Sequence, residues 1–229
     1  MPISTPELRD RRAFLTQLAT GSAALAAGGL ATHFTAGAAQ AESPASPDGY
    51  SEAWLGRLTG KHRQFFDAMT VNGGFALAFA MNFLNSNNDT YKLPDSNLSA
   101  VVGMRHFSIP MAFTDDIWAR YKLGEFFQIM DPATKTPSTR NFLYHPHDGD
   151  VPLPGMAIDK LVARGVQITC CNVALNVISG MTSKNAGVTP DVAKKEWVAG
   201  LIPGVVLVPS GVLAVNRAQE KGCTYCNGG

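Results

Sequence analysis

The chain contains 229 residues, of which 45% are hydrophobic and 16% are charged, and its formal net charge is +1 at pH 7. Its length and apolar content suffice for one domain with a hydrophobic core. A chain this close to neutral lacks the positive surface that attracts nucleic acid or anionic membranes, so we exclude nucleic acid as a partner.

The first 41 residues are predicted to be a twin-arginine signal peptide. Arg11 and Arg12 precede a weakly apolar stretch rich in Ala and Gly, and Ala39–Ala41 forms a small-x-small cleavage site. A membrane anchor is disfavoured because polar residues interrupt this stretch before it reaches ~20 strongly apolar residues. We therefore expect the twin-arginine export machinery as a partner, cleavage before Glu42, a periplasmic or extracellular location and no stable membrane insertion.

The mature chain is predicted to contain one α/β domain. The signal carries three arginines and two acidic residues, so its removal leaves the positive and negative charges balanced. Residues 42–60 are predicted to be a Ser/Pro-rich leader with a short helix. Residues 61–229 are predicted to be the domain, because strand and helix patterns alternate along them.

Five strand patterns alternate with helical patterns in this domain. The strands are predicted over residues 61–68, 98–104, 166–170, 205–208 and 223–226. Helices are predicted over residues 75–84, 114–123, 156–164, 172–181, 190–199 and 212–221. Asn85–Asp89 and Gly124 are expected to end the first two helices. This alternation predicts an α/β fold, namely a flavodoxin-like three-layer sandwich with a mostly parallel, about five-stranded sheet.

Residues 125–154 are predicted to be an irregular insertion. Five prolines in this segment rule out a long regular element. A structureless segment of this length is uncommon within a compact domain. A lid, an oligomer contact and a mobile insertion are the three interpretations that the pattern leaves open.

Cys171 is the main candidate for a reactive side chain. It lies in Gly165–Leu175, where a predicted buried strand gives way to a helix. In open α/β sheets, ligands collect beyond the carboxyl ends of the strands, and a helix N-terminus stabilises a thiolate. The alternative is an inert buried cysteine, since cysteine is among the most buried residue types. Cys170 should point to the opposite side of the strand, into the core.

Arg105 and His106 follow the second predicted strand and should reach the same edge of the sheet. His106 could act as a base toward Cys171 or bind a metal, or it could donate to a loop carbonyl. Arg105 could hold an anionic ligand, or it could pair with Asp115 or Asp116.

Four further polar residues follow predicted strands. Asn172 and Ser210 come after the third and fourth strands and are candidate ligand-binding residues. Asp67 and Asn72 come at the end of the first strand and beyond it, and either face the crevice or have a capping role.

The metal-binding candidates are weak. His145 and His147 could share a metal only if other ligands converge on them, and solvated loop residues are the alternative. Cys223 and Cys226 have the spacing of a metal knuckle, but a structural zinc site needs four ligands. A structural disulfide or two unpaired thiols is the default, and a link from Cys171 to Cys223 is open. No cofactor is identified, because the chain lacks a P-loop and a dinucleotide fingerprint.

The second half of the chain resembles the DsrE/DsrF-like family of sulfur-handling α/β proteins. The resemblance rests on Leu161–Val166, on Cys171-Asn172 six residues after Gly165, on Pro203–Val212 and on Ala218–Gly222 before an aromatic last strand. It implies a flavodoxin-like topology and a reactive cysteine at Cys171 that carries a persulfide. It also implies a homo-oligomer, either a trimer or a hexamer.

Two hypotheses on function follow. In the first, the protein is an exported DsrE-like protein that handles reduced sulfur, with Cys171 as a persulfide carrier or sulfurtransferase thiol. In the second, it is a non-catalytic periplasmic module that binds a ligand or metal, forms an oligomer and has structural cysteines. Whether the protein is an enzyme is left open by the residues.

Overall fold

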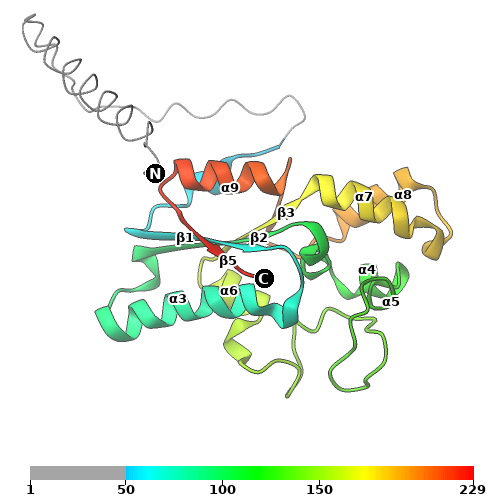
Figure 1. The fold of residues 1–229 in the computed structure, drawn as a ribbon, viewed down its shortest axis with the longest axis horizontal. Helices are drawn as coiled ribbons and strands as arrows, with labels where there is room; N and C mark the ends of the chain where they lie inside the picture. The colour runs from blue at the N-terminus through cyan, green and yellow to red at the C-terminus, as the bar shows by residue number, and fades with distance from the viewer. Residues whose placement is uncertain (1–49) are drawn as a thin grey trace, which may run out of the picture. The chain divides into compact units, whose positions relative to one another are not determined.

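A computed structural model describes residues 50–229 (Figure 1), so the predicted signal peptide at residues 1–41 lies outside the described residues. Five strands form one sheet in the order β4-β3-β2-β1-β5, and every neighbouring pair is parallel. The strands are β1 (His62–Ala68), β2 (Leu98–Met104), β3 (Gln167–Cys171), β4 (Val205–Val208) and β5 (Thr224–Asn227). The predicted α/β, flavodoxin-like arrangement is confirmed, and the sheet is parallel throughout.

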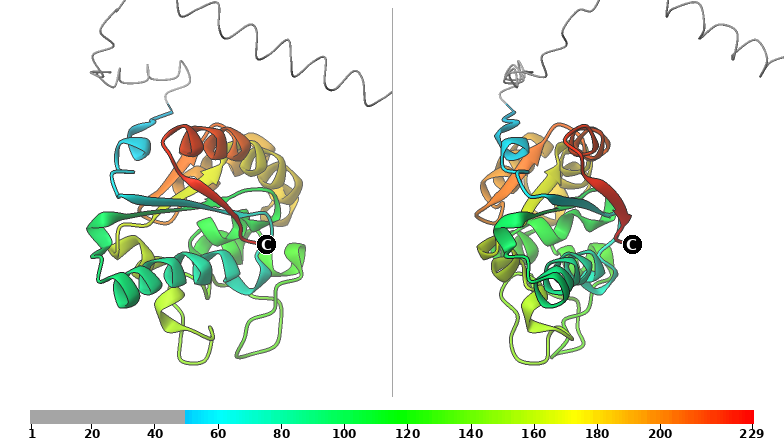
Figure 2. Two further views of the ribbon diagram at one scale, coloured as in Figure 1. Left: turned by 60° about the vertical axis from the view of Figure 1, so that its left-hand side comes forward. Right: turned by 90° about the vertical axis from the view of Figure 1, so that its left-hand side faces the viewer.

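Helices cover both faces of the sheet and make the outer two layers (Figure 2). One face carries α9 (Gly211–Glu220) and the short α2 (Ala53–Gly56), and the other carries α3 (Phe75–Tyr91) and α6 (Ile158–Ala163). The remaining helices are α4 (Asp115–Arg120), α5 (Leu123–Phe127), α7 (Asn172–Thr182), α8 (Pro190–Ala199) and the 3₁₀ helices η1 (Asn72–Gly74), η2 (Asp95–Asn97), η3 (His106–Ala112), η4 (Pro154–Met156) and η5 (Ser183–Ala186). Between residues 50 and 229, none of the helices has the length and hydropathy needed to cross a membrane.

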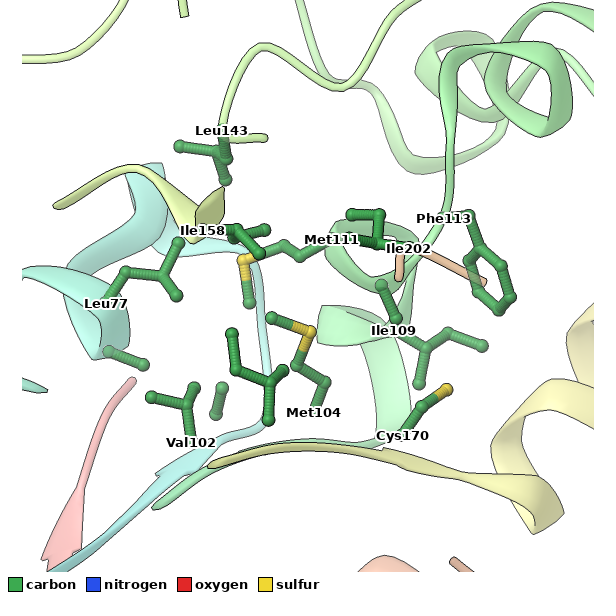
Figure 3. Packing of buried hydrophobic residues seen from close by; sticks show 14 of the residues in the cluster. Leu77, Val102, Met104, Ile109, Met111, Phe113, Leu143, Ile158, Cys170 and Ile202 are labelled. Carbon is green, nitrogen blue, oxygen red and sulfur yellow. The ribbon is translucent and has the colours of Figure 1, made fainter. Parts of the chain in front are cut away.

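The strands are apolar on both sides and divide the core into two clusters. Phe65 and Val101 pack in the cluster beneath α9, whereas Phe66 and Val102 pack in the larger cluster beneath α3. This double burial is typical of parallel strands, because crossover helices cover both faces. Figure 3 shows part of the larger cluster, into which Cys170 points from β3.

The chain changes face after β4. The connection after β3 runs through α7 and α8, whose buried residues belong to the core on the α3 face. The connection after β4 runs through α9, which crosses the opposite face and leads to β5 at the other edge of the sheet. The carboxyl ends of β3 and β4 therefore form a topological switch point, where open α/β sheets have a crevice.

The predicted end of the first long helix was wrong. Asn85–Asp89 was expected to end it, but α3 continues to Tyr91. Arg164 donates from Nη1 to Asn85 Oδ1 at 2.7 Å and from Nη2 to Asn88 Oδ1 at 2.8 Å. These bonds bind the polar side chains outside the helix, so they do not compete for its backbone groups.

The prediction that Gly124 ends a helix was also wrong. The predicted helix breaks at Tyr121 instead, and Gly124 lies inside α5. A Cβ at Gly124 would overlap the backbone of Ser138. A residue without a side chain is therefore required at position 124, because the insertion packs against it.

The insertion at residues 125–154 has irregular backbone between the end of α5 and η4, and a partly buried ion network holds its turns together. Arg140 donates from Nε to Asp131 Oδ2 at 2.6 Å and from Nη1 to Asp150 Oδ2 at 2.6 Å. Asn141 ties the same segment to the domain, since its Nδ2 donates to the carbonyl oxygens of Met111 and Phe113. The prolines exclude regular elements, and side-chain bonds replace the missing backbone ladder.

Candidate functional site

Cys171 lies at the switch point, at the junction of β3 and α7. It is the last residue of the strand and the N-cap of the helix, and its Sγ accepts a hydrogen bond from the backbone N–H of Ala174 at 3.4 Å. The residue is 6% exposed. The local sequence therefore places the sulfur at the N-terminus of an 11-residue helix.

Cys170 lies one position earlier and points to the other face of the sheet. It is fully buried among the apolar residues of the larger core, near Met104 and Ile109 (Figure 3). Burial raises the pKa of this thiol far above its usual range. Cys170 is a core residue, as predicted.

Arg105 lies at the carboxyl end of β2 and forms a bidentate ion pair with Asp67 at the end of β1. Its Nε and Nη2 each donate to a carboxylate oxygen at 2.7 Å, and Asp67 is 1% exposed. The hydrogen bonds to Asp67 raise the pKa of the Arg105 guanidinium. The sequence offered Asp115 or Asp116 as partners. The structure corrects this, because parallel pairing of β1 and β2 brings their carboxyl ends together.

Tyr225 on β5 completes the environment of Asp67. Its hydroxyl donates to Asp67 Oδ2 at 2.9 Å. Burial and this hydrogen bond raise the pKa of the Tyr225 hydroxyl. Tyr225 was not singled out from the sequence, because its contact depends on β5 lying beside β1 rather than beside β4.

Arg105 also connects the ion pair to the switch point. A negative charge on Cys171 also acts to raise the pKa of Arg105, after the larger effect of Asp67. On the other side, a Cβ at Gly211 would lie 2.6 Å from Arg105 Cβ and 2.7 Å from its Cδ. The start of α9 is therefore packed directly on the Arg105 side chain. We call Asp67, Arg105, Cys171 and Tyr225 the edge cluster.

Asn172 and Ser210 lie beside the edge cluster at the starts of two helices. Asn172 is the first residue of α7, and Ser210 is the N-cap of α9. The Ser210 hydroxyl makes no capping hydrogen bond with α9. Both residues are half-buried.

His106 also lies at this edge, but it is oriented differently from Arg105. Its backbone φ is 54°, and its ring packs edge-on against Phe107 with 4.3 Å between the ring centroids. Arg105, beside it in the sequence, is the residue whose pKa Cys171 affects.

The structure does not bring the metal-binding candidates together. His145 and His147 are exposed and lie near different carboxylates, His145 at 3.5 Å from Asp159 and His147 at 3.9 Å from Asp150. Among residues 50–229, no three His, Cys, Asp or Glu side chains are grouped in a way that could hold a metal ion.

The terminal cysteines face opposite sides of the sheet. Cys223 is buried in the cluster beneath α9, whereas Cys226 packs against the cluster beneath α3. All four cysteines are free thiols, so Cys171 and Cys223 are not joined. Burial raises the pKa of Cys223 to about 11.

Comparisons with known proteins give little further information. No family model matches the chain, and no curated protein matches it. A solved structure that resembles it is a protein of unknown function, MTH1491, from Methanobacterium thermoautotrophicum. The two chains are 17% identical, the match covers 72% of this chain and 98% of that chain, and the TM-score is 0.38. So loose an overlap says nothing about function.

Proposed function

We propose that the protein is an exported DsrE-like protein that handles reduced sulfur, with Cys171 as the thiol that carries or transfers it. One observation carries this proposal. The Cys171 sulfur lies at a helix N-terminus, at the switch point of the sheet, beside an arginine that Asp67 holds in place. The resemblance of the second half of the chain to the DsrE/DsrF-like family supports the same cysteine.

The proposed reaction is an exchange of sulfane sulfur. The Cys171 thiolate attacks the outer sulfur of a donor persulfide and forms a new S–S bond. The S–S bond of the donor breaks, and the donor leaves as a thiolate, so the charge balances and there is no net oxidation. With thiosulfate as the donor, the leaving group is sulfite. Attack requires the thiolate form of Cys171.

Arg105 is proposed to orient the anionic donor. Asp67 engages Nε and Nη2, which leaves Nη1 directed elsewhere for a sulfur or oxygen anion. Because the buried carboxylate fixes the guanidinium plane, no side-chain entropy is lost when the donor binds. Asn172 and Ser210 are proposed as further donors to the ligand. The exposed His106 is proposed to exchange the thiol proton with solvent.

Export and oligomerisation belong to the same proposal. The twin-arginine signal at residues 1–41 supports a periplasmic or extracellular location. Val173, Val177 and Met181 form an exposed apolar stripe along α7, each more than half exposed, which supports assembly with further copies of the chain. Sedimentation equilibrium tests this, and a monomer at all concentrations would contradict it.

The sulfur chemistry is tested by intact mass spectrometry of the folded protein after incubation with thiosulfate or a polysulfide, both of which carry sulfane sulfur. We expect a mass gain of one sulfur atom that a reducing agent reverses. The variant C171S should lose the adduct. The matched control C226S should keep it, although Cys226 is more exposed than Cys171.

One outcome favours the alternative function, a non-catalytic ligand-binding module with structural cysteines. The observation that supports this alternative is the low exposure of Cys171. If no adduct forms and iodoacetamide fails to label Cys171 in the folded protein, the sulfur-handling proposal is wrong.

A further inference from the structure

A cavity of about 540 Å³ lies on the α3 side of the sheet, close to the carboxyl ends of β1 and β2. Its wall is made by residues 70–73, by Phe107 and by residues 126–129 and Phe142. Residues 126–129 and Phe142 belong to the insertion and its junction with α5. The cavity is therefore a product of the insertion and of the turns that follow β1 and β2.

The lining of the cavity is aromatic and carries no charge. Four of the lining side chains are phenylalanines, and among the rest there is no Asp, Glu, Lys, Arg or His. Phe107 and Phe127 lie edge to face with centroids 5.9 Å apart, and Phe126 and Phe127 do so at 5.0 Å. A charged ligand would lose its hydration here without gaining an ion pair, so the cavity favours an uncharged one.

The size and the exposed wall also point to a ligand. A volume of about 540 Å³ falls within the ~300–1,000 Å³ typical of small-molecule sites. Phe107 is 48% exposed, which is unusual for an aromatic side chain that already packs on two others. A planar ring placed in the cavity would cover it and add edge-to-face contacts.

The polar residues of the wall are held in unusual backbone conformations. Asn72 has φ 37° and Gln128 has φ 55°, both in the left-handed region that non-glycine residues rarely adopt. Such conformations cluster at ligand sites. Each residue also carries an amide that can donate to or accept from one polar group on a ligand.

The wall is built before any ligand arrives. The Arg140 ion network holds the turns of the insertion to one another, and the Asn141 bonds to Met111 and Phe113 fix the insertion to the domain. The close contact of Gly124 with the backbone at Ser138 fixes it at α5. Binding therefore needs no ordering of the insertion, which preserves affinity.

We propose that this cavity is a binding site for a small, uncharged aromatic molecule that carries one or two hydrogen-bonding groups. The site is separate from the edge cluster, since none of its lining residues belongs to that cluster. It does not depend on sulfur chemistry at Cys171. It gives the 125–154 insertion a role as the wall of a binding site.

A pair of dyes that differ in one charge tests this. The uncharged 1-anilinonaphthalene should bind with a rise in fluorescence and a stoichiometry of one per chain. Its 8-sulfonate, which has the same rings, should bind about ten-fold more weakly or not at all. Equal binding of both dyes, or several dyes per chain, would mean adsorption to surface apolar residues and would overturn the proposal.

Variants locate the bound dye. F107A should weaken binding of 1-anilinonaphthalene by about ten-fold, because one face of the site is lost. The control F79A removes a phenylalanine of similar exposure that lies outside the cavity, on α3, and should leave binding unchanged. An equal effect of both variants, or none of F107A, would contradict the site.

A second variant covers the case in which F107A fails to fold. Thr70 is exposed and lines the cavity, so T70W fills the space from a position that tolerates bulk. T70W should abolish dye binding without lowering the melting temperature. Full binding by folded T70W would overturn the proposal. C171S should bind the dye as the wild type does, because the two sites are independent.

Discussion

Asp67 is the last polar residue of a strand whose neighbouring side chains are buried, and its two partners come from distant parts of the chain. Arg105 binds both carboxylate oxygens, and Tyr225 donates to one of them. A buried carboxylate without such partners would strongly disfavour folding. The ion pair between Asp67 and Arg105 thus stabilises the carboxyl edge of the sheet, and it also fixes the Arg105 side chain at the edge where Cys171 lies.

The variant D67N tests this pairing. Asparagine has the same shape but no charge, so it cannot accept two charge-assisted bonds from Arg105. We expect the free energy of unfolding to fall by about 2 kcal/mol. Urea denaturation followed by circular dichroism measures it.

A matched control is E220Q, which removes the exposed ion pair between Arg217 and Glu220. It should change the free energy of unfolding by less than about 0.5 kcal/mol. Equal losses in D67N and E220Q would show that the Asp67–Arg105 pair contributes no more than a surface pair.

The helix α9 is positioned by contact between its first residue, Gly211, and Arg105. A Cβ at Gly211 would lie 2.6 Å from Arg105 Cβ, which is closer than two side chains can approach. The start of α9 is therefore packed on Arg105, whose pKa Cys171 in turn affects. A change at the start of the helix should be transmitted through Arg105 to the thiol.

The variant G211A tests the packing of α9 on Arg105. We expect α9 or Arg105 to shift, with a loss of about 2 kcal/mol in the free energy of unfolding. The yield of the sulfur adduct on Cys171 should also fall. Thermal denaturation and the intact-mass assay measure the two effects.

Gly180 provides the control within α7, because a Cβ there would meet only Pro190 Cβ, at 3.9 Å. G180A should raise the free energy of unfolding by about 0.5 kcal/mol, since alanine restricts the unfolded chain and favours helix. A G211A protein as stable and as reactive as G180A would contradict the contact between α9 and Arg105.

Elements whose pattern is local could be predicted from the sequence, and those that depend on distant contacts could not. The strands Leu98–Met104 and Val205–Val208 have the predicted bounds, because each is an apolar run between turn residues. The end of α3 was misplaced because Arg164, far along the chain, binds Asn85 and Asn88.

The same distinction applies to the edge cluster. Cys171 could be placed at a strand–helix junction because that junction is encoded by adjacent residues. The pairing of Arg105 with Asp67, and the arrival of Tyr225, depend on the strand order β4-β3-β2-β1-β5. Strand order is set by packing of the whole sheet, which periodicity in a single sequence does not reveal.

The two ends of the insertion are joined to each other by charges that titrate in acid, since Arg140 pairs with both Asp131 and Asp150. The hydrogen bond from Arg140 lowers the pKa of Asp150 below 3.8. For Asp131, burial acts to raise the pKa, but the N–H of Thr134 and the Arg140 side chain outweigh it, and the pKa is lowered. Both carboxylates therefore stabilise the folded state above their unfolded pKa, and this contribution is lost as pH falls through the folded value.

The variant R140M tests this pH dependence. At pH 7 we expect it to lower the free energy of unfolding by about 3 kcal/mol, because two buried carboxylates lose their partner. The difference from the wild type should shrink as the pH is lowered from 5 to 3, where the carboxylates become protonated. Urea titrations across this range measure it, and a gap that stays constant to pH 3 would show that packing, not charge, holds the insertion.

The cysteines differ in exposure, so their rates of alkylation report on different openings of the folded protein. Cys170 is sealed in the core, whereas Cys226 is partly exposed. An alkylating reagent can reach Cys170 only when the sheet opens, so its labelling rate follows the opening of the core. All three alkylation rates can be measured in one time course of peptide masses, without any added probe. The rate at Cys226 would show that the reagent is active, the rate at Cys171 would measure access to the carboxyl edge of the sheet, and the rate at Cys170 would measure unfolding of the domain.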